Sequence, residues 1–198
     1  MTERRRFHMT DSMLSGNQIA ILVANGFEEV HFTEVQRRFA STGAKVTVIS
    51  PENGLVNGWH ENSWGHYFPI DKQLSDVLAA DYSALIIPGG KRSIDKLAAN
   101  PHGRRIVTGF VDAEKPMVVF GDATGLLGTF ERAAGRKLSA EGKTAELLTE
   151  AGATVSEEPT TLSGSILSST VVEVEPVKEL IEQAIELIGS TGEVANAA

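Results

Sequence analysis

Short apolar runs alternate with amphipathic segments along most of this chain, and this alternation limits the folds open to it. The runs hold four to six residues, chiefly Ile, Val, Leu and Ala, as is typical of strands buried on both faces. Alternating strands and helices with right-handed crossovers predict an α/β fold, a doubly wound three-layer α/β/α sandwich with a mostly parallel sheet. The expected strands are residues 19–24, 46–49, 84–87 and 117–120.

Helix positions follow from apolar periodicity and from glycine and proline boundaries. The first helix follows Asn25 and Gly26 and ends at Gly43. The last has Pro176 in its first turn and Gly189 at its end. The other expected helices are residues 93–111, 123–134 and 143–151. Residues 161–174 are rich in Ser, Thr and Val and predict one or two strands, as a hairpin turning at Ser163 and Gly164 if there are two.

The length of 198 residues fits one domain. We expect a disordered leader at residues 1–17, a single α/β domain at 18–190 and a frayed tail at 191–198. The leader carries Arg4, Arg5 and Arg6, but no apolar stretch of signal-peptide length follows them. A cytoplasmic location is therefore expected.

Charge and composition exclude several classes of function. The 26 acidic residues outnumber the 18 basic ones, and a net charge of −8 disfavours binding to nucleic acid. No apolar run approaches the length that spans a bilayer, so no membrane partner is expected. Cysteine is absent, which excludes disulfides, thiolate metal sites and every mechanism that needs a cysteine nucleophile.

Candidate site residues lie where three expected strands end. In open α/β sheets, ligands bind outside the carboxyl ends of the strands. The first strand leads to Glu28 and His31, the third to Gly90, and the fourth to Gly121 and Asp122. The last of these turns has the layout of a nucleophile elbow, a sharp connection from strand to helix.

These motifs resemble the ThiJ/PfpI superfamily, relatives of the class I glutamine amidotransferases. The resemblance covers about residues 19–188. It rests on Phe27-Glu28-Glu29-Val30, on Pro88-Gly89-Gly90, and on Lys115-Pro116 followed by the elbow and Leu126-Leu127. It implies a flavodoxin-like, glutamine-amidotransferase-like sandwich, found in small proteases, deglycases and chaperone-like proteins that commonly form dimers or higher oligomers.

The sequence departs from this superfamily at the elbow. Gly121 stands where the enzymes carry a cysteine, and Asp122 where a histidine usually follows. Glycine has no side chain, so covalent thiolate chemistry is excluded. The resemblance further implies that Glu28 is a pocket carboxylate and that the backbone N–H of Gly90 is an oxyanion-type donor. His31 falls where many members have a second glutamate. Asp95 matches, across a one-residue gap, an acid that some members lend to a neighbouring subunit.

Two interpretations of the polar residues remain open. Glu28, His31 and Asp122 suit acid–base catalysis without a covalent intermediate, because a carboxylate beside an imidazole orients it as a base. Alternatively, Glu28 and Asp122 only cap the N-termini of helices.

Residues 54–68 form a long aromatic connection with Trp59, Trp64 and His66. It suits an interface anchor or a ligand lid, or else a surface flap that packs on its own aromatic side chains. A metal site from His31, His60, His66 and Glu28 lacks HxH or HExxH spacing. No metal or cofactor is therefore expected.

Three functions follow from these features. We expect a non-catalytic stress, chaperone-like or small-ligand-binding protein that pairs with itself as a homodimer or higher oligomer and binds a small metabolite. The alternative is a repurposed hydrolase, hydratase or lyase that uses Glu28, His31 or Asp122 as acid or base. A third hypothesis is a subunit that docks on a partner through the loop from Trp59 to Trp64.

Overall fold

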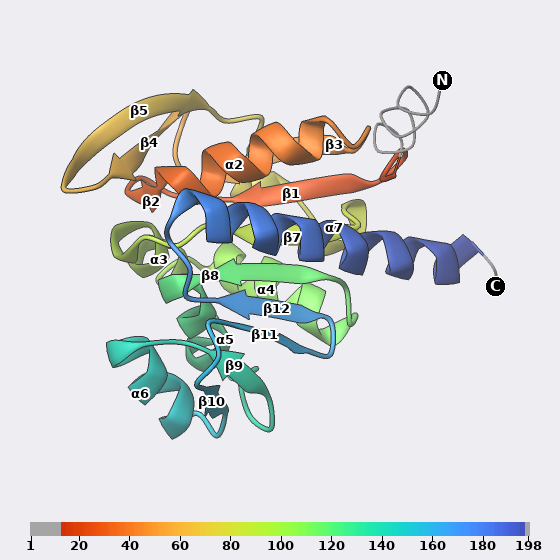
Figure 1. Ribbon diagram of the computed structural model, residues 1–198. Coiled ribbons are helices and arrows are strands. Elements are labelled where there is room, and N and C mark those ends of the chain that lie inside the picture. Colours follow the sequence, from red (N-terminus) through yellow and green to blue (C-terminus); the bar gives the residue numbers. More distant parts are fainter. Residues whose placement is uncertain (1–12, 197–198) are drawn as a thin grey trace.

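The structure, a computed structural model, describes residues 13–196, and the side chains up to Thr191. A central sheet of seven strands separates two layers of helices (Figure 1). The neighbouring strands of the sheet are parallel except β11 and β12, which form an antiparallel pair. The strand order is β11 (Thr160–Ser163), β12 (Ile166–Ser169), β8 (Met117–Phe120), β7 (Ala84–Ile87), β1 (Gln18–Leu22), β3 (Lys45–Ser50) and β6 (Lys72–Gln73). The predicted α/β fold with a mainly parallel sheet is confirmed.

The helices cover both faces of this sheet. Helices α2 (Glu29–Ala40) and α7 (Val174–Asn196) pack side by side on one face. Helices α3 (Lys91–Ala98), α4 (Pro101–Asp112) and α5 (Gly125–Thr129) cover the other. Outside these layers lie a parallel pair, β9 (Lys137–Ser139) and β10 (Thr154–Ser156), and α6 (Gly142–Glu150). Short 3-10 turns span Leu74–Asp76 (η1), Ala79–Asp81 (η2) and Gly121–Thr124 (η3).

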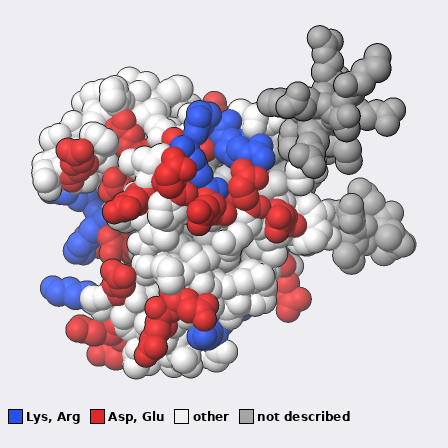
Figure 2. Space-filling model, in the orientation of Figure 1, with Lys and Arg blue, Asp and Glu red and all other residues white. Residues whose placement is uncertain are grey.

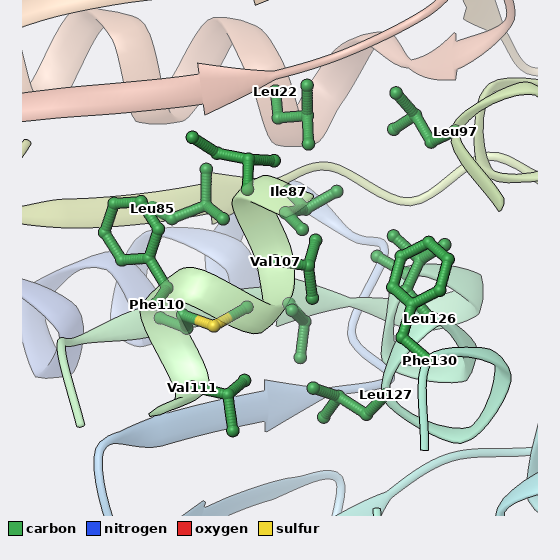
Figure 3. Packing of buried hydrophobic residues seen from close by; sticks show 14 of the residues in the cluster. Leu22, Leu85, Ile87, Leu97, Val107, Phe110, Val111, Leu126, Leu127 and Phe130 are labelled. Atoms are coloured by element: carbon green, nitrogen blue, oxygen red, sulfur yellow. The ribbon is translucent and has the colours of Figure 1, made fainter. Parts of the chain in front are cut away.

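Alternation along the buried strands divides the core in two. In β1, Ala20 and Leu22 face the α3–α5 layer, whereas Ile19 and Ile21 face α2 and α7. Figure 3 shows the first of these clusters, in which side chains of β1 and β7 meet those of α4 and α5. Burial on both faces explains why the strand sequences are uninterrupted apolar runs.

One expected helix is divided in the structure. Residues 93–111 belong to two helices, α3 and α4, rather than one. The break lies at Asn100, whose side-chain oxygen accepts hydrogen bonds from the N–H groups of His102 at 2.8 Å and Gly103 at 3.4 Å. Pro101 occupies the first position of α4, where its missing N–H costs nothing. The prediction was wrong here because a cap and a proline together start a new helix.

Other predicted boundaries were also wrong. The helix expected at 123–134 is η3 followed by the short α5, because the chain turns at Glu131, which has a φ of +59°. Helix α7 continues through Gly189 to Asn196, so the residues expected to fray from 191 are helical to that point. Gly189 lies within the helix and packs near Leu14, because a Cβ built on Gly189 would lie 3.8 Å from the Cδ2 of Leu14. Leu14 is fully buried, so the expected leader is ordered from residue 13, and residues 1–12 lie outside the described part.

The aromatic connection is a β-hairpin. Strands β4 (Leu55–His60) and β5 (Ser63–Pro69) pair in antiparallel fashion, and β4 also pairs with β2 (Phe27–Glu28) at the end of β1. The expected hairpin at Ser163 and Gly164 is confirmed as β11 and β12. Among residues 13–196, no helix is both long and apolar enough to cross a bilayer.

Acidic and basic side chains are interleaved on the face that α2 and α7 form (Figure 2). The guanidinium of Arg38 on α2 donates two hydrogen bonds, at 2.5 and 2.9 Å, to the carboxylate of Glu182 on α7. This pair bridges the two helices above their apolar contact, and its exposure limits its contribution to stability.

Candidate functional site

A cavity of about 360 Å³ opens at the carboxyl ends of β1, β7 and β8. Successive parallel strands lie on opposite sides of β1, so this edge is the topological switch point at which α/β proteins bind ligands. The cavity brings together most of the predicted site residues, namely Glu28, His31, Trp59, Gly90, Gly121 and Asp122. Trp64, His66 and Asp95 are not among the residues that line it.

Gly121 forms the elbow between β8 and η3. Its φ of +52° lies in the left-handed region, which favours glycine. A Cβ built on Gly121 would meet no atom within 4 Å. The position of the missing nucleophile is therefore empty space inside the cavity rather than a site filled by neighbouring side chains.

The turn after β7 has no such space. Gly90 has a φ of +112°, and a Cβ there would lie 2.5 Å from the carbonyl oxygen of Gly26 and 2.8 Å from the nitrogen of Glu28. The N–H of Glu28 donates to the carbonyl of Gly89 at 2.7 Å, which joins this turn to the start of α2. Within the described residues, the N–H of Gly90 has no hydrogen-bond acceptor, and both Gly90 and Gly121 border the cavity.

His31 is a fixed neutral imidazole at the base of the cavity. Its Nδ1 accepts a hydrogen bond from the N–H of Gly89 at 3.1 Å, so its Nε2 carries the proton and donates to the carbonyl of Val171 at 2.9 Å. The ring stacks on Phe120 with 4.4 Å between centroids. Burial lowers the pKa of His31 to about 4. Both ring nitrogens are occupied, so this geometry does not support the hypothesis that His31 is a general base.

We expect His31 to make the protein less stable in weak acid. Because the folded pKa is depressed, the unfolded chain takes up a proton as pH falls from 6.5 towards 4, while the folded chain does not. This difference amounts to about 2 kcal/mol between pH 7 and pH 5. Urea unfolding at the two pH values measures it in the wild type and in His31→Gln, with His102→Gln as the matched control. An equal pH dependence in all three proteins would contradict the assignment.

Glu28 and Asp122 face the same cavity with different partners. Burial raises the pKa of Glu28, and this effect outweighs the opposing effect of His60. The Asp122 carboxylate accepts a hydrogen bond from the Thr144 hydroxyl at 3.3 Å. Neither side chain makes a capping hydrogen bond, although Glu28 directly precedes α2 and Asp122 lies in the first turn of η3. Glu28 is a partly buried carboxyl group in the wall of the cavity.

Glu29 anchors the hairpin. Its carboxylate accepts hydrogen bonds from the N–H of His66 at 2.9 Å and from the Nδ1 of His66 at 2.5 Å. Burial alone would raise the pKa of Glu29, but the His66 hydrogen bonds outweigh it and lower that pKa. Gly58 and Gly65 make room for the carboxylate, since a Cβ on Gly65 would overlap it. The hairpin is therefore held to α2 by the buried Glu29 carboxylate, which His66 contacts from the exposed side.

The two tryptophans of the hairpin meet edge to face, with 5.4 Å between their ring centroids. Trp59 turns towards the cavity, whereas Trp64 is exposed. Asp95 forms an ion pair with Lys91 one turn away on α3, at 2.8 Å. Among the described residues, no three His, Asp or Glu side chains lie close enough together to hold a metal ion. His31, His60, His66 and Glu28 therefore do not form a metal site in this structure.

Several lining residues were not predicted from the sequence. Thr144 and Glu141 come from the α6 region, Thr170 and Val172 from the segment before α7, and Arg92 from α3. None belongs to a motif. Proximity to a glycine-rich strand end was the one available signal for Arg92, which directly follows Pro88-Gly89-Gly90 and Lys91.

A mostly parallel sheet, an elbow after β8 and a cavity at the switch point together define a flavodoxin-like α/β protein with an elbow pocket. The chain belongs to the DJ-1/PfpI family, whose model matches residues 17–186. The resemblance inferred from the motifs is thereby confirmed.

Relatives within this family carry varied names. The chain is 31% identical over 153 residues to a Bacillus subtilis protein named "Putative cysteine protease YraA", covering 77% of this chain and 88% of that one. It is 31% identical over 123 residues to General stress protein 18 of the same organism, covering 62% and 69%. The structure of a ThiJ/PfpI domain protein from Brachyspira murdochii superposes with a TM-score of 0.77 at 18% identity, covering 89% and 98%.

Proposed function

We propose that this protein binds a small polar metabolite in the elbow pocket without forming a covalent bond to it. The observation that supports this most is Gly121, a residue without a side chain at the elbow of an otherwise open cavity. A cavity of about 360 Å³ lies at the lower end of the range for small-molecule sites and has room for a small metabolite. The name of General stress protein 18 makes a role under stress a reasonable part of the proposal.

The polar groups of the cavity suit a carbonyl or hydroxyl compound. The N–H of Gly90 offers a donor to an oxygen atom, and Glu28 offers a carboxyl group whose pKa is raised by burial. Trp59 and Val172 supply an apolar wall. Such groups bind and orient a ligand, but no side chain at position 121 attacks it.

A paired measurement tests the proposal. We expect methylglyoxal to disappear no faster with the protein than in buffer, because the nucleophile is missing. Hydroxyacetone and pyruvate are unreactive three-carbon probes, and we expect at least one to shift the amide resonances of Gly90, Gly121 and Asp122 saturably. The amide of Gly164, in the β11–β12 turn, serves as the control. If neither probe shifts the pocket amides, or if both shift Gly164 equally, the binding proposal is wrong.

A second candidate function rests on Glu28. Burial raises the pKa of this carboxyl group, which is the direction that acid–base catalysis by a hydratase or lyase requires. This candidate predicts methylglyoxal consumption above buffer that Glu28→Gln abolishes. Such a result would replace the binding proposal with a carboxylate-driven enzyme.

A further inference from the structure

The guanidinium of Arg92 lies over an aromatic ring in the wall of the cavity. Its guanidinium carbon is 3.9 Å from the centroid of the Trp59 ring and 5.9 Å from that of Trp64. Both Arg92 and Trp59 line the cavity. Stacking of a guanidinium on an indole fixes its plane while its N–H groups remain free to bind other partners.

Contacts on both sides fix this pair in place. A Cβ built on Gly26 would lie 2.6 Å from the Cβ of Arg92 and 3.2 Å from its Cδ, so the arginine stem occupies the space that a side chain at position 26 would fill. On the other side, the contact between Glu29 and His66 anchors the hairpin that carries Trp59. Arg92 is exposed, and its contacts with Gly26 and Trp59 restrict the positions that its side chain can take.

The charge of Arg92 has no carboxylate partner among the described residues, and its side chain makes no hydrogen bond there. Its neighbours on α3 differ in this respect. Lys91 forms an ion pair with Asp95, and Lys96 forms one with Glu52 at 2.7 Å. Of the two cationic side chains that line the cavity, Arg92 is thus the one still available to an anion.

We propose that Arg92, held on Trp59, anchors the carboxylate group of the pocket's ligand. A guanidinium matches a carboxylate with two parallel N–H···O hydrogen bonds. Asp122 and Glu141 line the same cavity and disfavour a dianion, so the ligand class is small monocarboxylates that carry a carbonyl or hydroxyl group. This inference rests on the proposed binding function and names its ligand class.

Pyruvate and hydroxyacetone test this assignment, because they share a three-carbon carbonyl skeleton and differ in the carboxylate. We expect pyruvate to bind the wild type at least about tenfold more tightly than hydroxyacetone. In Arg92→Gln, pyruvate should lose about tenfold in affinity while hydroxyacetone is unchanged. Arg92→Lys should recover only part of the loss, because an ammonium lacks the planar fork. Dissociation constants come from titrating the Gly90 and Gly121 amide shifts.

Arg104→Gln is the matched control. Arg104 also lies over an aromatic ring, with its guanidinium carbon 5.9 Å from the Phe130 centroid, but it pairs with Glu131 and does not line the cavity. Its loss removes the same charge and should leave pyruvate affinity unchanged. If both Arg92→Gln and Arg104→Gln lost pyruvate affinity equally, the effect would come from the net charge of the protein, and the assignment would be overturned. Binding of hydroxyacetone as tight as pyruvate would overturn it and leave the proposed function standing, whereas binding of neither would overturn both.

Discussion

Gly121→Cys is expected to give this protein a reactive thiol at the elbow. The introduced Cβ points into open space, and the left-handed φ of +52° costs about 1 to 2 kcal/mol for a residue with a side chain. The variant should therefore fold with a modest loss of stability. Because the wild type has no cysteine, every alkylated cysteine reports on the introduced thiol.

The pocket should make this thiol more reactive than an exposed one. Thiolates attack electrophiles, and hydrogen-bond donors or cations near the sulfur raise the thiolate fraction. The free N–H of Gly90 and the cation Arg92 both border the same cavity. We expect iodoacetamide at pH 7 to alkylate Gly121→Cys about tenfold faster than a thiol with the ordinary pKa of about 8.5.

Gly135→Cys provides the matched comparison. Gly135 also has a positive φ, +75°, and no atom within 4 Å of a built Cβ, but it is exposed and lies outside the cavity. Mass spectrometry of both variants over time gives the two rates. Equal rates would mean that the cavity no longer has the environment of a nucleophile site. The divergence of this chain would then extend well beyond the loss of one side chain.

The sequence predicted the central sheet because burial leaves a direct mark on composition. Strands β7 and β8 are covered on both faces, so every residue in them is apolar and the predicted bounds match the structure. The hairpin gave no such signal. All seven residues of β5 are exposed or half-buried, and Gly58 and Gly65 interrupt the pattern. These two glycines leave space for the Glu29 carboxylate, which packs against them. This contact joins segments that are distant in the sequence, so no local pattern predicts it.

For the candidate site, the location was predictable from the sequence, but the roles of the side chains were not. Turns that end parallel strands must meet at one sheet edge, so Glu28, Gly90 and Gly121 were expected to lie together. The roles of individual side chains were harder to predict. His31 suggested a base, but the structure surrounds it with one backbone donor and one backbone acceptor. Arg92 was missed because its importance depends on Trp59, thirty-three positions away in the chain and adjacent only after folding.

Gly90→Ala is expected to cause the largest loss of stability. The added Cβ would lie within 2.9 Å of three backbone atoms, of Gly26, Phe27 and Glu28, at a φ of +112°. Backbone atoms cannot move aside as the end of a flexible side chain can, so the turn after β7 must separate from the start of α2. We expect a loss of about 4 kcal/mol or more in the free energy of unfolding and a fall in Tm of roughly 10 °C.

Gly121→Ala is the control that separates steric overlap from backbone strain. It adds the same methyl group at a positive φ, but into open space, so it should cost only about 1 to 2 kcal/mol. Urea unfolding, followed by the fluorescence of Trp59 and Trp64, measures both variants. Similar losses in the two would show that φ alone decides the cost. A much larger loss in Gly90→Ala would mean that this turn is packed so tightly against β2 that only its N–H remains available to a ligand, whereas the elbow opposite it keeps room for one.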